Sequence, residues 1–272
     1  MYDPEVSAQN RSSPPPETRL QVPGGAAEPL DGLRRRRREL DAWLSLRGLT
    51  HTLSLAAYLT HRRVRRLIEE VPPGRVLDAG SGRGPHRQAL ERRGCDVLAI
   101  DIEDRGGSAD LLGDLQAMPE VASGSVDGVV CTQVLEHLPR PWDAVSEIAR
   151  VLRPGGWLIL SAPHLSPIHE APRDYYRYTG FALRRLLADR GLDVRSVEAA
   201  GGLIAFLAHG GSAAWLSLGG GLPLLRRTAW ALNYLLAGRL LAPLDHWFGL
   251  RSVYPANYVV LAVKEPAAGA AR

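Results

Sequence analysis

The stretch VLDAGSGRG at residues 76–84 decides the fold of this chain. It runs from an apolar segment, predicted as a short strand at residues 75–78, into a turn of alternating glycines. Residues 85–93 then have a helical pattern that ends at Gly94. Glycine allows positive φ and lets a ligand approach the backbone closely. In an open α/β sheet such a turn lies at the carboxyl ends of the strands, so the stretch predicts a strand, a ligand-binding turn and a helix.

The spacing and charge of this turn indicate its ligand. Gly80, Gly82 and Gly84 form G-x-G-x-G, which is one residue shorter than the G-x-G-x-x-G of dinucleotide-binding turns. Asp78 stands just before the turn, and a carboxylate there would repel a pyrophosphate. It suits a ligand that carries an ammonium group and a sulfonium cation, as S-adenosylmethionine does. A nicotinamide cofactor, or a turn whose glycines serve packing alone, are the weaker alternatives.

Strands and helices alternate through much of the remaining chain, which predicts a doubly wound α/β fold with a mainly parallel sheet covered on both faces. The expected strands are residues 95–101, 110–112, 126–132, 157–162, 192–198 and 257–264, and the expected helices are residues 142–152 and 180–190.

Composition divides the chain into four parts. Residues 1–38 are rich in proline and glycine and are expected to be a disordered arm, and residues 39–70 have a helical pattern. Residues 71–198 and 251–266 hold the alternating core. The five arginines from Arg34 to Arg38 have two interpretations, a solvated charge cluster before a helix or an anchor for acidic lipid head groups.

Residues 199–250 form an apolar insertion before the last strand. No acidic residue lies between Glu198 and Asp245, and the length could span a bilayer. Repeated glycines interrupt the stretch and disfavour one long helix. We therefore expect two or three short apolar helices that lie on the core as a lid, or in a membrane interface.

Overall composition narrows the function classes. The 272 residues suit one α/β domain with additions, and the net charge of +4 comes from arginine, with Lys264 the single lysine. This bias gives little support to a nucleic-acid partner. Cys95 and Cys131 lack metal-type spacing, so no metal site is expected, and the first residues show no secretory pattern. The expected location is cytoplasmic, with peripheral membrane contact through residues 199–250 and the arginine run.

Further motifs complete the pattern. The predicted strand at residues 95–101 ends in Asp101, a place where a carboxylate can accept hydrogen bonds from both ribose hydroxyls, with Glu103 as a nearby alternative. GDLQAMP follows at residues 113–119, SVDGVVCTQVLEH at 125–137 and LRPGG at 152–156. As a set, these motifs resemble the class I methyltransferases of the type 11 group, which includes the ubiquinone/menaquinone C-methyltransferase-like proteins. The resemblance covers about residues 75–163, and Val126 stands where that group usually has phenylalanine.

The resemblance implies a Rossmann-like sheet of seven strands that binds S-adenosylmethionine, with its last two strands antiparallel. It also implies roles for nine residues. Asp78, Gly80 and Gly82 would hold the methionine end, Asp101 the ribose, Ile102, Asp114 and Leu115 the adenine, and Thr132 and Gln133 would line the methyl-transfer site. The alternative for Asp114 is a turn-initiating or capping aspartate.

The substrate side has a weaker signature. The loop HLSPIHEAPRDYYRYT at residues 164–179 resembles one found in a subset of type 11 proteins. His137 and His169 are the candidate general bases, with Asp174 as an orienting partner. Tyr175, Tyr176 and Arg177 are the candidates to shape an acceptor pocket. The alternatives are that His137 is a buried structural histidine, that the tyrosines only pack, and that Thr179 serves as a helix N-cap.

The sequence therefore predicts an S-adenosylmethionine-dependent methyltransferase that acts on an oxygen or carbon of a small or lipid-linked acceptor. The alternative is a catalytically degenerate binding module or membrane adaptor with the same fold. The acceptor and the oligomeric state stay open.

Overall fold

The computed structural model describes residues 55–208, 231, 235 and 241–266. The predicted arm at 1–38, residues 39–54 and most of 209–240 lie outside this part of the chain. In order, the elements are α2 (Leu55–Glu70), β1 (Arg75–Ala79), α3 (Arg87–Arg92), β2 (Asp96–Asp101), β3 (Leu111–Leu112), β4 (Val126–Thr132), the 3-10 helix η2 (Leu135–His137), α4 (Pro141–Val151), β5 (Leu152–Pro163), α5 (Gly180–Ala188), β6 (Leu192–Ala200), α8 (Ala242–Trp247), α9 (Leu250–Val253) and β7 (Asn257–Lys264).

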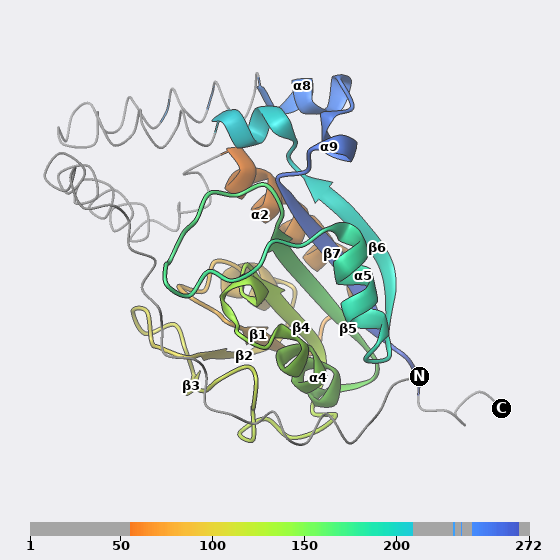
Figure 1. The fold of residues 1–272 in the computed structure, drawn as a ribbon. Coiled ribbons are helices and arrows are strands. Elements are labelled where there is room, and N and C mark those ends of the chain that lie inside the picture. Colours follow the sequence, from red (N-terminus) through yellow and green to blue (C-terminus); the bar gives the residue numbers. More distant parts are fainter. Residues whose placement is uncertain (1–54, 209–230, 232–234, 236–240, 267–272) are drawn as a thin grey trace, which may run out of the picture.

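The strands form one sheet of seven in the order β3-β2-β1-β4-β5-β7-β6 (Figure 1). The first five in this order pair in parallel, whereas β7 runs antiparallel to both β5 and β6. This confirms the predicted doubly wound, mainly parallel seven-stranded sheet with an antiparallel pair at one edge.

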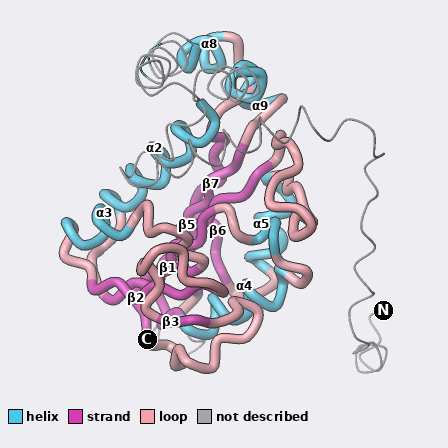
Figure 2. Tube along the Cα trace, turned by 90° about the vertical axis from the view of Figure 1, so that its left-hand side faces the viewer, coloured by secondary structure: helices cyan, strands magenta, loops and turns pink. Residues whose placement is uncertain are grey.

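Helices cover both faces of the sheet, with α2 and α3 on one side and α4 and α5 on the other (Figure 2). The apolar side of α2 packs Val64, Leu67 and Ile68 against the sheet, as the three- and four-residue spacing predicts. Thr60, the polar member of that stripe, is buried and donates its hydroxyl hydrogen bond to the carbonyl of Ala56 at 2.9 Å. On the other face, Ile148 of α4 belongs to the larger core cluster.

Most predicted elements differ by one or two residues from the bounds in the structure, and the start of β5 differs by more. Helix α3 begins at Arg87 rather than at residue 85, because the N–H of Arg87 still bonds back to the carbonyl of Gly84 in the turn. Strand β5 begins at Leu152 rather than at residue 157, because Leu152 already pairs with Val126 before a local shift in register. Gly155, with φ of 78°, lets the chain bend within this longer strand.

The first two residues of the predicted insertion, 199–200, belong to β6, because they still pair with β7. The helices described within it or at its end are residues 203–208, α8 and α9. Asp245 of α8 is fully buried, and its carboxylate accepts hydrogen bonds from the N–H groups of Gly202, Ile204 and Ala205 at 2.8–2.9 Å. The far end of the insertion is thus fastened to its beginning. Within the part of the chain that the structure describes, no helix has the length and apolar character needed to cross a membrane.

Candidate active site

The predicted cofactor residues lie along one edge of the sheet, where neighbouring parallel strands end. Asp78 of β1 pairs with residues of β2 on one side and of β4 on the other. Asp101 is the last residue of β2 and Thr132 the last of β4. The turn after β1 is held in place because the N–H of Gly80 donates to the carbonyl of Ile100 at 2.8 Å. Residues from three strands therefore converge on this turn.

The glycines of the turn serve both packing and access. Gly80, Gly82 and Gly84 have φ values of 74°, 56° and 63°, which disfavour other residues. A Cβ at Gly80 would lie 2.5 Å from the Cγ2 atom of Val134, so packing alone requires glycine there. A Cβ at Gly82 would meet nothing within 4 Å, so this side of the turn faces open space.

Asp78 is a buried acid next to the turn. Its exposed fraction is 2%, and its Oδ2 atom has no hydrogen-bond partner among the described residues. Burial raises the pKa of Asp78 to about 7, with the charge of Arg87 opposing the shift and that of Asp101 adding to it. Such a carboxylate is costly unless a cation compensates it. The ammonium group of S-adenosylmethionine would do so.

Asp101 links the end of β2 to the turn. Its Oδ2 atom accepts a hydrogen bond from the N–H of Gly82 at 2.8 Å, and its Oδ1 atom accepts one from the N–H of Glu103 at 3.2 Å. These bonds fix the carboxylate while lone pairs stay available to ribose hydroxyls. Ile102, next in the chain, is 58% exposed, which leaves an apolar surface for an adenine ring.

Asp114 and Leu115 follow β3 on the same edge. The carboxylate of Asp114 accepts from the N–H of Gln116 at 2.9 Å, which is the bond of a turn-initiating aspartate. The side-chain amide of Gln116 donates to the same carboxylate. Leu115 is buried, at 4% exposure. The structural role proposed as an alternative for Asp114 is thus present, and its contact with adenine stays a prediction.

Gln133 has an unusual backbone at the end of β4. Its φ of 56° lies in the left-handed region, which non-glycine residues seldom adopt and which often marks functional sites. Hydrogen bonds to Ser161 of β5 hold it, from the Gln133 N–H to the carbonyl at 2.9 Å and from the side-chain amide to the hydroxyl at 3.1 Å. Thr132 pairs with Ser161 in the sheet. The structure places both residues at the end of β4, and their role at a methyl-transfer site stays a prediction.

A cluster of three ionisable residues follows β4. Glu136 of η2 is fully buried, and neither carboxylate oxygen has a hydrogen-bond partner among the described residues. Its Oε1 atom lies 3.8 Å from Nε2 of His137 and 3.9 Å from Nε2 of His169. Burial raises the pKa of Glu136 to about 8. The structure therefore brings together the two histidines that the sequence proposed separately as bases.

Hydrogen bonds to carbonyl groups set the tautomer of both histidines. Nδ1 of His137 lies 2.5 Å from the carbonyl oxygen of Arg173, and Nδ1 of His169 lies 3.2 Å from that of Pro167. Because a carbonyl only accepts, Nδ1 is the donor nitrogen in both rings, which leaves Nε2 as the nitrogen that can accept a proton. Both Nε2 atoms lie close to the carboxyl group of Glu136. The cluster can therefore accept a proton at an Nε2 atom.

The same geometry suits a cation. One ligand atom from each of Glu136, His137 and His169 lies within 4.8 Å of the others, and these are residue types that bind zinc and related metals. No metal site was expected from the sequence, because Cys95 and Cys131 lack metal-type spacing. His169 stands far from Glu136 and His137 in the chain, and no familiar spacing joins the three.

Asp174 orients the loop that carries His169. Its carboxylate accepts from the N–H of His169 at 2.8 Å and pairs with the Arg177 guanidinium at 2.6 and 2.8 Å. Burial alone would raise the pKa of Asp174, but these hydrogen bonds outweigh it and lower the pKa to about 2. Nδ1 of His169 is 3.6 Å from the same carboxylate. Arg177 is thus engaged in holding this loop, and its contact with an acceptor stays a prediction.

The tyrosines of the loop differ in their surroundings. Tyr176 donates its hydroxyl hydrogen bond to the carbonyl of Pro139 at 3.0 Å, a packing role proposed as the alternative. Tyr175 is 46% exposed, and its N–H bonds to the carbonyl of Glu136 at 2.8 Å. Thr179 accepts at 3.1 Å from the N–H of Ala182, which confirms it as the N-cap of α5.

Glu136 is a site residue for which the sequence alone indicates no role, although it lies within the stretch SVDGVVCTQVLEH at residues 125–137. The available signal was an acidic residue between the apolar strand of residues 126–132 and the apolar Leu138. Acidic residues are seldom buried unless they have a partner, so this position could have indicated a site.

Comparison with known proteins agrees with this geometry. Residues 77–160 match the family described as "Methyltransferase domain", of type 11. Residues 77–160 are a class I methyltransferase domain of the type 11 group. A ubiquinone biosynthesis O-methyltransferase of Paracidovorax citrulli is 34% identical over 101 residues, covering 32% of this chain and 42% of that protein. The chain spans about half the length of the curated relatives it matches.

Solved structures share the methyltransferase fold at low sequence identity. A SAM-dependent methyltransferase from Archaeoglobus fulgidus has a TM-score of 0.51 at 18% identity, covering 76% of this chain and 94% of that one. The 1,6-didemethyltoxoflavin-N1-methyltransferase of Burkholderia thailandensis, solved with S-adenosylhomocysteine, has a TM-score of 0.51 at 16% identity, covering 90% and 93%. S-adenosylmethionine is the cofactor of the domain, and the buried Asp78 and the open face of Gly82 fit it.

Proposed function

We propose that the protein transfers a methyl group from S-adenosylmethionine to an oxygen or carbon of a small or lipid-linked acceptor, with oxygen favoured. The observation that carries this proposal is the pair of Nε2 lone pairs held beside the buried Glu136, just beyond the cofactor turn. Val134, which packs over Gly80, connects the two regions. An oxygen acceptor needs a base for its proton, and this cluster supplies one.

Bound S-adenosylmethionine supplies an electrophilic methyl carbon, whose bond to sulfur breaks as the bond to the acceptor forms, leaving S-adenosylhomocysteine. His169 is the candidate to take the hydroxyl proton at Nε2, because its side chain is 37% exposed and that of His137 only 17%. The carboxylate of Asp174, 3.6 Å from Nδ1 of His169, would stabilise the imidazolium, and its hydrogen bond from the backbone N–H of His169 would hold that residue in place. The chain's part is thus to position the acceptor and to receive one proton.

Two observations support the acceptor class. The first curated relatives carry the name ubiquinone biosynthesis O-methyltransferase, which speaks for an oxygen acceptor. The composition of residues 199–250 supports an apolar or lipid-linked one. Peripheral membrane contact through this segment and the arginines from Arg34 to Arg38 belongs to the same proposal.

The first experiment is calorimetric titration of the purified protein with S-adenosylmethionine, S-adenosylhomocysteine and NADH, alongside Asp101→Ala. We expect both sulfur compounds to bind, NADH not to bind, and Asp101→Ala to lose binding because its carboxylate holds Gly82 and would meet the ribose. A folded sample that binds neither sulfur compound would contradict the proposal.

The second experiment tests turnover. The protein is incubated with isotopically labelled S-adenosylmethionine and extracts of small molecules and lipids, and labelled methyl ethers are identified by mass spectrometry. A labelled product that disappears in His169→Gln supports the oxygen acceptor. Cofactor binding without any labelled product from either extract favours the alternative, a catalytically degenerate binding module or membrane adaptor.

A further inference from the structure

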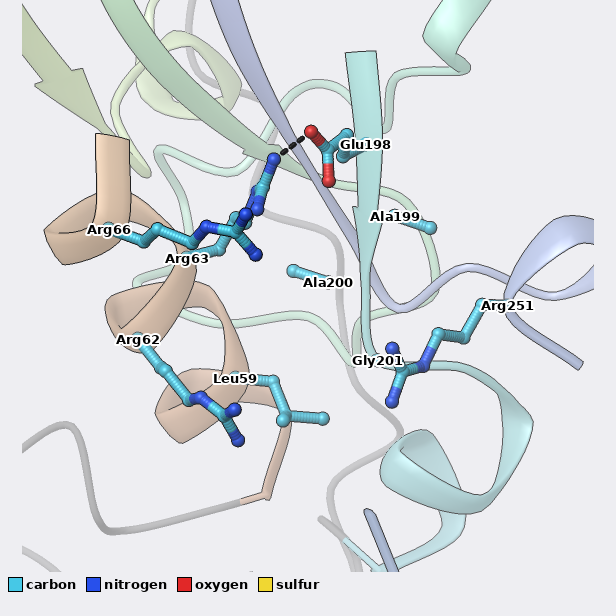
Figure 3. Close-up of a pocket in the computed structure, with 9 residues that line it drawn as sticks. All are labelled: Leu59, Arg62, Arg63, Arg66, Glu198, Ala199, Ala200, Gly201 and Arg251. Carbon is cyan, nitrogen blue, oxygen red and sulfur yellow. Dashed lines mark hydrogen bonds and ion pairs between the residues drawn. The ribbon is translucent and has the colours of Figure 1, made fainter. Parts of the chain in front are cut away.

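A cavity lies away from the cofactor turn, between the middle of α2, the end of β6 and α9 (Figure 3). Its volume is about 290 Å³, at the small end of the range for ligand pockets. We call it the arginine pocket, because four arginines line it against a single carboxylate. The lining residues are Leu59, Arg62, Arg63, Arg66, Glu198, Ala199, Ala200, Gly201 and Arg251.

Among the described residues that line this pocket, arginines outnumber carboxylates by four to one. Arg63 forms an ion pair with Glu198, the carboxylate of the lining (Figure 3). Arg66 contacts Glu70 at 3.0 Å, but both side chains are largely exposed, and such pairs contribute little. An excess of positive charge therefore faces a small concave space, which focuses the potential there.

Arg63 shows the effect of this crowding. Its side chain is 19% exposed, and its Nε atom is buried with no hydrogen-bond partner among the described residues. Burial lowers the pKa of Arg63, and the neighbouring charge of Arg66 lowers it further. A buried donor without a partner costs free energy, and an anion in the pocket would relieve both that cost and the mutual repulsion of the arginines.

We propose that the arginine pocket binds a phosphate monoester group. The planar fork of a guanidinium matches phosphate oxygens with two parallel hydrogen bonds, and a doubly charged anion balances several arginines better than a carboxylate does. The apolar walls, Leu59 and the segment from Ala199 to Gly201, leave room for a short apolar stem beneath the phosphate.

The surroundings indicate where such a phosphate could come from. Arg251 belongs to α9, and large apolar side chains stand exposed on both sides of it in the chain. Trp247 is 82% exposed, Phe248 66% and Val253 65%. Exposed aromatic residues next to a cationic pocket are typical of contact with a lipid interface. A phosphate on a lipid head group and a phosphate on a soluble compound share the chemistry, and the test separates them.

The test uses the full chain in two binding assays. Vesicles of phosphatidylcholine with or without phosphatidic acid measure the lipid source by flotation. Calorimetry with inorganic phosphate and glycerol 3-phosphate, at matched ionic strength, measures the soluble source. Arg62→Glu should weaken binding about tenfold or more, because the change replaces attraction by repulsion at short range. Arg65→Glu is the matched control, since Arg65 is exposed on the same helix and does not line the pocket.

A second variant acts in the opposite direction. Glu198→Gln removes the carboxylate that competes for Arg63, so it should tighten phosphate binding. Binding of phosphatidic acid vesicles alone assigns a lipid head group, and binding of the soluble phosphates alone assigns a soluble compound. No binding in either assay, or equal loss in the pocket variant and in Arg65→Glu, overturns the proposal. S-adenosylhomocysteine titration of each variant shows that it is folded, and it keeps this outcome distinct from failure of the methyl-transfer proposal.

Discussion

Asp78 should make cofactor binding depend on pH below neutrality. Burial raises the pKa of this carboxyl to about 7 in the free protein, so below that pH most molecules carry it neutral. The cofactor ammonium pairs with the ionised form, and binding must then release a proton from Asp78. The apparent affinity is therefore expected to fall about tenfold for each pH unit below about 7, which corresponds to about 1.4 kcal/mol per unit.

Asp78→Asn gives the matching perturbation. The variant should bind S-adenosylhomocysteine weakly at all pH values and lose the slope. It should also be more stable when free. An acid whose pKa is raised on folding destabilises the folded state as pH climbs from its unfolded value, 3.8, to its folded value, about 7. The full cost, on the order of 4 kcal/mol, is present above pH 7 and absent in acid, so the gain in Asp78→Asn should appear only toward higher pH.

The assay is calorimetric titration with S-adenosylhomocysteine across this pH range, together with chemical denaturation of the free protein. Asp96→Asn is the control, because Asp96 lies on the neighbouring strand β2 but is exposed. An affinity that stays flat through weakly acidic pH in the wild type, or an Asp78→Asn variant that keeps the slope, would refute the reasoning.

Three further outcomes are expected. Gly80→Ala should abolish S-adenosylhomocysteine binding and lower the free energy of unfolding by more than the roughly 1 kcal/mol expected for the control Gly94→Ala. Both positions have positive φ, but only a Cβ at Gly80 would also meet Val134. Equal losses of stability in the two variants would contradict this. His169→Gln should lower the rate of methyl transfer about 10²- to 10⁴-fold and leave cofactor affinity unchanged. His164 lies outside the cluster, so His164→Gln should leave the rate unchanged. A shift in the cofactor Kd of His169→Gln would point to a structural role. Asp245→Ala should lower the free energy of unfolding, measured by chemical denaturation, by on the order of 3 kcal/mol, because three N–H groups lose their acceptor. Asp193 is exposed, and a loss no larger than that of Asp193→Ala would count against this role of Asp245.

The cofactor half of the site could be predicted because its signals are local. The turn from Gly80 to Gly84, Asp78 before it and Asp101 at the end of the next strand each reveal their place through short-range pattern. Parallel strands then bring such ends together without further information. The bounds of β5 were harder, since Leu152 pairs across to Val126 and the glycines after it look like a stop in the sequence alone.

The rest depends on contacts between distant segments. Glu136 belongs to η2 and His169 to the loop after β5, and nothing in the spacing of the chain indicates that their side chains lie 3.9 Å apart. The arginine pocket is a stronger case. Arg62 and Arg66 lie on the exposed side of α2, and only the tertiary structure shows that Glu198 and Arg251 stand opposite this part of the helix.

The insertion leaves and rejoins the sheet at neighbouring points, since Ala200 at the end of β6 pairs with Asn257 at the start of β7. The entropy cost of closing a loop between two paired residues rises only slowly with the length of the loop, so a longer or shorter insertion there changes stability little. The segment between β6 and β7 can therefore vary in length and sequence without changing the sheet or its cofactor edge. Related chains could therefore change what they methylate, or where they dock, by trading this one segment while the strands that hold the cofactor stay as they are.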